Sequence, residues 1–136
     1  MHRRTLFIAV LALGLLAVPA LAQDQINVTE ILLGSELEEG VVTSPATSFA
    51  RGSTPLYCMV RLENPSRAAG AITIGFERAE GEPAANPGGR RLEIPARPRY
   101  RTVARASLNR PAGTWRCVVR AEDGSVLTHA DFTVTE

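Results

Sequence analysis

The sequence predicts an all-β protein, an antiparallel sandwich or barrel of about seven strands. Short extended segments with apolar residues at alternate positions recur along the chain. Turn residues separate these segments at intervals of roughly ten residues. No segment has the apolar period of about 3.6 residues that marks an amphipathic helix.

The first expected strand is 26–33 (INVTEILL), in which apolar and polar residues alternate weakly. An acidic turn, GSELEEG at 34–40, follows, and Val41 begins a short extended piece. The segment 44–55 (SPATSFARGSTP) is rich in Ser, Thr, Pro and Gly and therefore cannot be helical.

The central strands are clearer. The strand in 55–64 (PLYCMVRLEN) must end at Asn64, because the following Pro65 disfavours helical geometry before it and lacks a backbone donor. Residues 71–78 (AITIGFER) form the next strand, with the apolar residues on one face. An open loop, GEPAANPGG at 81–89, ends this part of the chain.

The C-terminal part supplies the remaining strands. Residues 90–95 and 99–108 give one or two of them, and a Pro-Ala-Gly turn leads into the strand that carries Trp115. Asp123-Gly124 signals a hairpin, since glycine tolerates the positive φ of tight turns. The last strand is 126–134.

Residues 1–22 have the features of a secretory signal peptide. A basic head precedes an apolar run from Leu6 to Val18, and Ala20-Leu21-Ala22 is a small-x-small exit. The run is shorter than the roughly 20 residues that cross a bilayer, so we expect no membrane span after cleavage. The remainder, 23–136, is expected to form one domain in the periplasm or outside the cell.

Cys58 and Cys117 are expected to form a disulfide. Each lies on the more apolar side of its strand, and exported proteins meet an oxidising compartment. On the chain-entropy model such a bond stabilises the fold by about 4 kcal/mol. The alternatives are a redox pair or metal thiolates, but there is no C-x-x-C spacing and no histidine cluster nearby.

Charge is segregated along the chain. Residues 24–82 hold nine acidic residues and four arginines, whereas residues 90–120 hold nine arginines and one glutamate. One interpretation is that the two parts pair across the fold. The other is an anion-binding face, with Arg97, Arg99, Arg101 and Arg105 as the expected ligand-binding residues.

Candidates for chemistry are few. His129 is the one histidine after the predicted leader and lies two positions from Asp131 on the same strand face. Glu36, Glu38 and Glu39 could hold a calcium ion, but they lack the Asp and Asn oxygens at loop spacing that such sites use, so a solvated acidic turn is expected. Cys58, Met59 and His129 are soft copper ligands only if Cys58 is reduced.

The stretch Gly113-x-Trp115-x-Cys117 resembles the Gly-x-Tyr-x-Cys stretch of the immunoglobulin fold. This resemblance implies an immunoglobulin-like β-sandwich with Cys58 on the opposite sheet. Trp115 replaces the corner tyrosine, whose hydroxyl bond is therefore expected to be missing. No tryptophan follows Cys58 at the immunoglobulin spacing, so Phe76 or Ile74 is expected to fill that space.

A second resemblance covers most of residues 23–136. The segments SPATSF, YCMVRLEN, RYRTVARASL and AGTWRCVVRAEDGSVLTHADFTV are similar to the bacterial exported modules of the domain of unknown function 2914 family. The tail is the most specific part. The resemblance implies strand and turn positions and no assigned activity.

We therefore expect a non-enzymatic, exported interaction module of the bacterial cell envelope, without catalytic residues, metal site or cofactor. Its expected partner is an envelope protein or an anionic polymer; export argues against nucleic acid. The alternative is a small metal-dependent or hydrolytic enzyme centred on His129 and Asp131. A third possibility is a structural accessory domain without a ligand.

Overall fold

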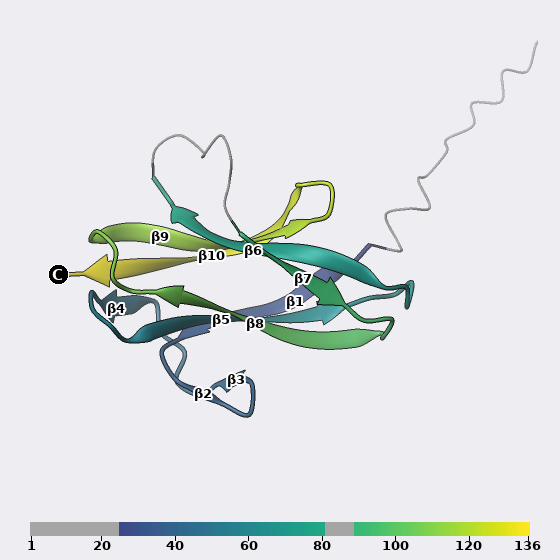
Figure 1. Ribbon diagram of the computed structural model, residues 1–136, viewed down its shortest axis with the longest axis horizontal. Helices are drawn as coiled ribbons and strands as arrows, with labels where there is room; N and C mark the ends of the chain where they lie inside the picture. The colour runs from purple at the N-terminus through teal and green to yellow at the C-terminus, as the bar shows by residue number, and fades with distance from the viewer. Residues whose placement is uncertain (1–24, 81–88) are drawn as a thin grey trace, which may run out of the picture.

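The computed structural model describes residues 25–80 and 89–136, and these residues form two facing β-sheets (Figure 1). The predicted leader, 1–22, and most of the loop at 81–89 lie outside the described residues. Within the described part every regular element is a strand. No helix there could cross a membrane.

The described residues contain ten strands instead of about seven. They are β1 (Asn27–Gly34), β2 (Leu37–Glu38), β3 (Val41–Val42), β4 (Ser48–Ala50), β5 (Pro55–Glu63), β6 (Gly70–Arg78), β7 (Arg90–Ile94), β8 (Arg99–Ser107), β9 (Gly113–Ala121) and β10 (Val126–Thr135). The excess consists of β2, β3 and β4, each two or three residues long. The seven longer strands match the seven expected ones closely.

The strands form a three-stranded sheet, β1-β5-β8, a five-stranded sheet, β4-β10-β9-β6-β7, and the small β2-β3 pair. All pairings are antiparallel except one: β4 runs parallel to the end of β10, with Phe49 beside Val134. The prediction of a purely antiparallel sandwich is wrong at this edge. After the β2-β3 hairpin the chain crosses to the five-stranded sheet, where β4 runs in the same direction as β10.

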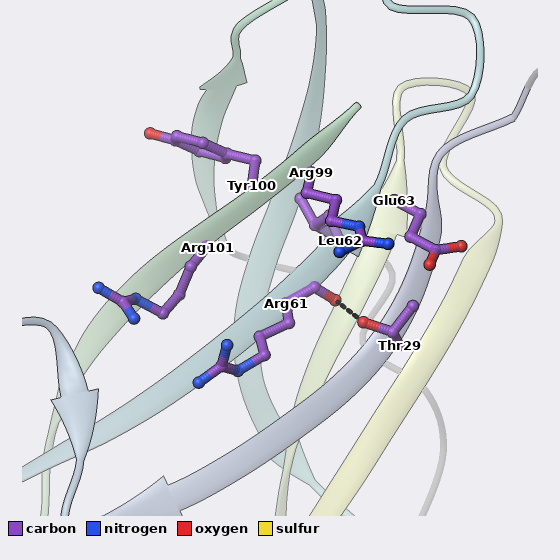
Figure 2. Close-up of a pocket in the computed structure, with 7 residues that line it drawn as sticks. All are labelled: Thr29, Arg61, Leu62, Glu63, Arg99, Tyr100 and Arg101. Atoms are coloured by element: carbon purple, nitrogen blue, oxygen red, sulfur yellow. Dashed lines mark hydrogen bonds between the residues drawn. The ribbon is translucent and has the colours of Figure 1, made fainter. Parts of the chain in front are cut away.

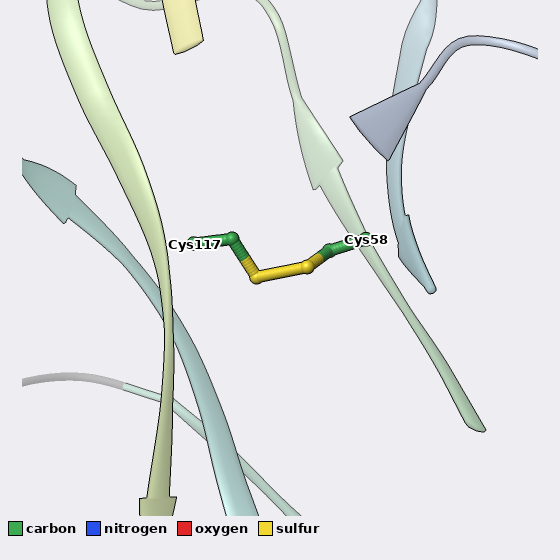
Figure 3. The surroundings of a disulfide bond; sticks show 2 residues. All are labelled: Cys58 and Cys117. Atoms are coloured by element: carbon green, nitrogen blue, oxygen red, sulfur yellow. A yellow bond between two sulfur atoms is a disulfide. The ribbon is translucent and has the colours of Figure 1, made fainter. Parts of the chain in front are cut away.

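The core lies between the inner faces of the two sheets. On β5 the predicted apolar face (Leu56, Cys58, Val60, Leu62) is buried, and on β9 Cys117 and Val119 are buried opposite it. Cys58 and Cys117 form the predicted disulfide, with Cα atoms 6.7 Å apart (Figure 3). Ile74 is buried in this core and Phe76 packs against it. Either residue was expected to fill the space of the immunoglobulin tryptophan.

Trp115 supplies the corner bond that the sequence comparison expected to be missing. Its indole Nε1 donates to the carbonyl oxygen of Pro111 at 2.9 Å, four residues upstream. Two guanidinium groups stack on the ring, Arg78 at 4.9 Å and Arg110 at 4.7 Å from its centroid. Burial lowers the pKa of Arg110. The tryptophan therefore replaces the corner tyrosine through a different donor atom.

A small second core lies on the outer face of the three-stranded sheet. Met59 points away from the main core yet is fully buried, and Val42 of β3 is buried too. The β2-β3 hairpin lies against this face below β5 (Figure 1). Its two-residue turn, Glu39-Gly40, has φ values of 51° and 78°, as a type I′ turn requires. The acidic segment is therefore a hairpin that covers apolar side chains.

The predicted hairpin at Asp123-Gly124 joins β9 and β10, and Gly124 has a φ of 88°. The pairing is irregular between Val126 and Thr128. This bulge exposes Val126 and packs Leu127 against the core, the reverse of simple alternation. From Thr128 onward the predicted strand phase holds.

Asn64 is the buried polar residue of the described core. Its backbone N–H donates to Pro98 at 2.8 Å, and its side-chain amide donates to Ala68 at 2.7 Å. It thereby ties the turn after β5 to the turn before β8. The residue that ends the strand is also a bridge between two turns.

Candidate anion-binding site

Three arginines gather on the outer face of the three-stranded sheet. Arg61 of β5 and Arg101 of β8 are direct cross-strand partners, and Arg99 lies two pairs further along, opposite Glu63. We call Arg61, Arg99 and Arg101 the arginine surface. Their side chains share this face because residues two apart on a strand point the same way. Like charges directly opposite each other destabilise a sheet; Glu30 offsets the charge of Arg61, and an anion bound beside Arg101 would offset the other.

The arginine surface borders an open depression of about 400 Å³ (Figure 2). Thr29, Leu62, Glu63 and Tyr100 complete its lining. This volume is within the range of about 300–1,000 Å³ typical of small-ligand sites. Its lining is far more cationic than such sites usually are, which fits a carboxylate or phosphate group better than an apolar molecule.

The three guanidinium groups are held to different extents. Arg61 Nε is 3.0 Å from Glu30 Oε1. Arg101 Nη2 donates to the backbone oxygen of Glu39 at 3.1 Å, which also fixes the tip of the β2-β3 hairpin. Arg99 makes no ion pair with any residue in 25–80 or 89–136. The surface therefore offers two positioned cations and one with all its donors available.

The structure brings together two of the four predicted arginines. Arg99 and Arg101 lie in the depression, whereas Arg105 lies further along β8, beyond Val103 and opposite Tyr57. Arg97 is exposed in the turn before β8 and borders a different depression beside Glu93. All four are exposed, but they do not form one cluster.

Arg61 is the member of the arginine surface that sequence reasoning missed. Arg61 lies in residues 24–82, where acids outnumber arginines, so the search for arginine-rich segments did not select it. The strand phase contained a signal, because Arg61 lies on the side of β5 opposite Cys58. Only the register between β5 and β8 places it beside Arg101.

Three of the nine arginines in 90–120 pair with acids on or beside the five-stranded sheet. Arg116 is 3.2 Å from Asp131, Arg91 is 3.2 Å from Glu122, and Arg120 is 3.2 Å from Glu77. The last pair is the least exposed, with side chains 15% and 21% accessible. Of these three pairs only Arg120–Glu77 joins the arginine-rich part to the acid-rich part, so among the described residues the predicted pairing of the two parts is limited to it. The arginine surface has three arginines beside two acids, Glu30 and Glu63.

His129 and Asp131 do contact each other, with Nδ1 and Oδ1 3.4 Å apart. Arg116 binds the same carboxylate oxygen. Among residues 25–80 and 89–136, no three histidine, cysteine or acidic side chains are placed to hold a metal ion together. Cys58 is oxidised, so the copper arrangement with Met59 and His129 is wrong.

Comparison with known proteins locates the family resemblance in the C-terminal strands. Residues 89–134, which span β7 to β10 almost completely, match the family model described as "Protein of unknown function (DUF2914)". The predicted family resemblance is confirmed over this segment. The earlier segments, SPATSF and YCMVRLEN, lie outside the matched residues. No curated protein matches the chain.

Solved structures show the same fold at low sequence identity. An immunoglobulin-like protein from Pseudomonas aeruginosa superposes with a TM-score of 0.52 at 18% identity, covering 84% of this chain and 99% of that one. A mutant β-glucosidase from Listeria innocua, in complex with laminaribiose, gives 0.52 at 11% identity; the match covers 82% of this chain but 16% of the enzyme. The fold is therefore immunoglobulin-like, as predicted.

Proposed function

We propose that this immunoglobulin-like domain is an exported, non-enzymatic interaction module of the bacterial cell envelope that binds an anionic partner. The observation that carries the proposal is the arginine surface: Arg61 and Arg101 lie side by side, and Arg99 has no ion pair among the described residues. Bidentate contacts to carboxylate or phosphate are the strongest hydrogen bonds that guanidinium groups make.

Export is supported by the signal-like segment at 1–22 and by the disulfide, since such bonds persist in oxidising compartments. The buried disulfide makes a rigid platform of β5, on which Arg61 lies. A rigid platform limits the entropy lost when the arginines engage a partner.

The test is binding of polyglutamate and of polyphosphate, two anionic polymers, measured by fluorescence anisotropy at several salt concentrations. Replacing Arg99 and Arg101 together by alanine should weaken binding about tenfold or more and flatten its salt dependence. The matched control is Arg90→Ala with Arg91→Ala on β7, which removes the same charge from the other sheet. Equal losses in both double variants, or binding insensitive to salt, would refute the proposal.

The alternative enzyme centred on His129 and Asp131 has one observation in its favour, their 3.4 Å contact. Arg116 holds the same carboxylate, and both side chains of the pair are about half exposed. A general base works best in a pocket that excludes water and fits its substrate, and this pair lies on the open surface. His129→Ala should therefore leave anion binding unchanged.

A further inference from the structure

The strand that carries Arg99 and Arg101 lies at the end of its sheet. In the order β1-β5-β8, strand β8 pairs with β5 on one side and, among the described residues, with no strand on the other (Figure 1). It spans nine residues, Arg99–Ser107. Such an edge presents a row of backbone N–H and C=O groups on which another extended chain can pair.

Hydrogen bonds at both margins of β5 show which residues of β8 face outward. Asn64 donates its backbone N–H to Pro98, across the β5-β8 boundary. Thr29, on the β1 side, donates its hydroxyl to the backbone oxygen of Arg61. Because the two backbone groups of a strand residue point to the same side and alternate along the strand, even-numbered residues of β8 face β5.

The outward-facing backbone groups of β8 therefore belong to the odd-numbered residues, Arg99, Arg101, Val103, Arg105 and Ser107. The carbonyl of Ser107 already accepts from Arg110 Nε at 2.7 Å, which is consistent with this orientation and ends the row. The first four of these residues form the open edge. Three of the four carry arginine.

The charges decide what kind of chain this edge accepts. A second copy that paired antiparallel about Val103 would place Arg101 of each copy opposite Arg105 of the other. Like charges directly opposite each other oppose such pairing, and charged edge residues commonly protect against self-association. An acidic segment reverses the sign at every one of these positions.

We propose that β8 accepts an extended acidic polypeptide segment as an added strand. The backbone of the segment pairs with Arg99, Arg101, Val103 and Arg105, and its carboxylates, at alternate positions, meet the arginines on the outer face. This inference rests on the proposed function and names its partner as a polypeptide. Main-chain bonds supply affinity, and the arginines supply specificity.

The experiment uses the disulfide-bonded protein and an eight-residue peptide with glutamate at alternate positions and valine between them. The control peptide has the same side chains but N-methylated backbone amides at the positions that would pair. We expect the methylated peptide to bind about tenfold more weakly or worse. Hydrogen exchange followed by NMR should show new protection at the amides of Arg101 and Val103.

The protein variant Val103→Pro provides the reciprocal control. It removes an outward N–H without removing a bond to β5 and leaves every charge in place. We expect the variant to bind the peptide much more weakly while still binding polyphosphate. Circular dichroism verifies that the variant folds. The methylated peptide keeps the test valid if this variant does not fold.

The outcomes separate the two proposals. Equal binding of both peptides, with the arginine dependence intact, would overturn strand addition and leave the anion-binding function standing. Binding of neither peptide nor polymer would overturn both. Protection of amides in the β7 edge instead of β8 would place the added strand elsewhere and refute the inference.

Discussion

Trp115 anchors the turn before β9 by a hydrogen bond to Pro111 and by cation–π contacts with Arg78 and Arg110. Trp115→Phe removes the 2.9 Å hydrogen bond to Pro111, a loss of about 1 kcal/mol. It also weakens two cation–π contacts, with Arg78 and Arg110, each contributing about 0.5–1 kcal/mol at such exposed positions. Since phenylalanine keeps part of the stack, we expect the free energy of unfolding to fall by about 2 kcal/mol.

The assay is urea unfolding followed by circular dichroism, because the chain has a single tryptophan and the variant loses its fluorescence. A double-mutant cycle with Arg110→Ala separates the stack from the bond. A coupling energy of roughly 0.5 kcal/mol or more is expected between the two residues. A Trp115→Phe cost below about 0.5 kcal/mol, within the usual range for an unimportant surface change, would show that the corner does not anchor this turn.

Three further changes test other parts of the structure. Asn64→Ala should lower the free energy of unfolding by about 1–2 kcal/mol, because it removes the side-chain amide bonds to the backbone oxygens of Ala68 (2.7 Å) and Pro95 (3.4 Å) and keeps the backbone bond to Pro98; an unchanged melting temperature would contradict this. Glu39→Asn should stabilise the protein by about 0.5–1 kcal/mol, since asparagine tolerates positive φ, while Glu38→Asn, the matched control, should not. The side-chain and backbone bonds from Ser125 lower the pKa of Asp123; these bonds favour the charged form, so Ser125→Ala should raise that pKa in an NMR titration, and an unmoved pKa would show that the hydroxyl bond is not formed.

Alternation and turn chemistry were enough to predict the seven longer strands, and together with the expected export they predicted the disulfide. The apolar face of β5 and the glycine of the β9-β10 turn depend on neighbouring residues alone, so the sequence predicts both. The bulge after Val126 could not be predicted in this way. Pairing with β9 determines which residue of β10 is left without a partner.

The candidate site depends on information that alternation does not contain. Met59 falls on the outer face by its phase, yet the β2-β3 hairpin buries it. Arg61 and Arg101 are forty residues apart in number and meet only through the register of β5 with β8. The arginine count pointed to β8, whereas the cluster of Arg61 with Arg99 and Arg101 follows only from the pairing of β5 with β8.

The buried position of the Cys58–Cys117 disulfide makes its rate of reduction a measure of how often the two sheets separate. Both sulfur atoms are shielded from solvent on every side, so a small reductant reaches them only when the two sheets separate. The rate of thiol release under mild reducing conditions then reports how often the molecule opens, without any label.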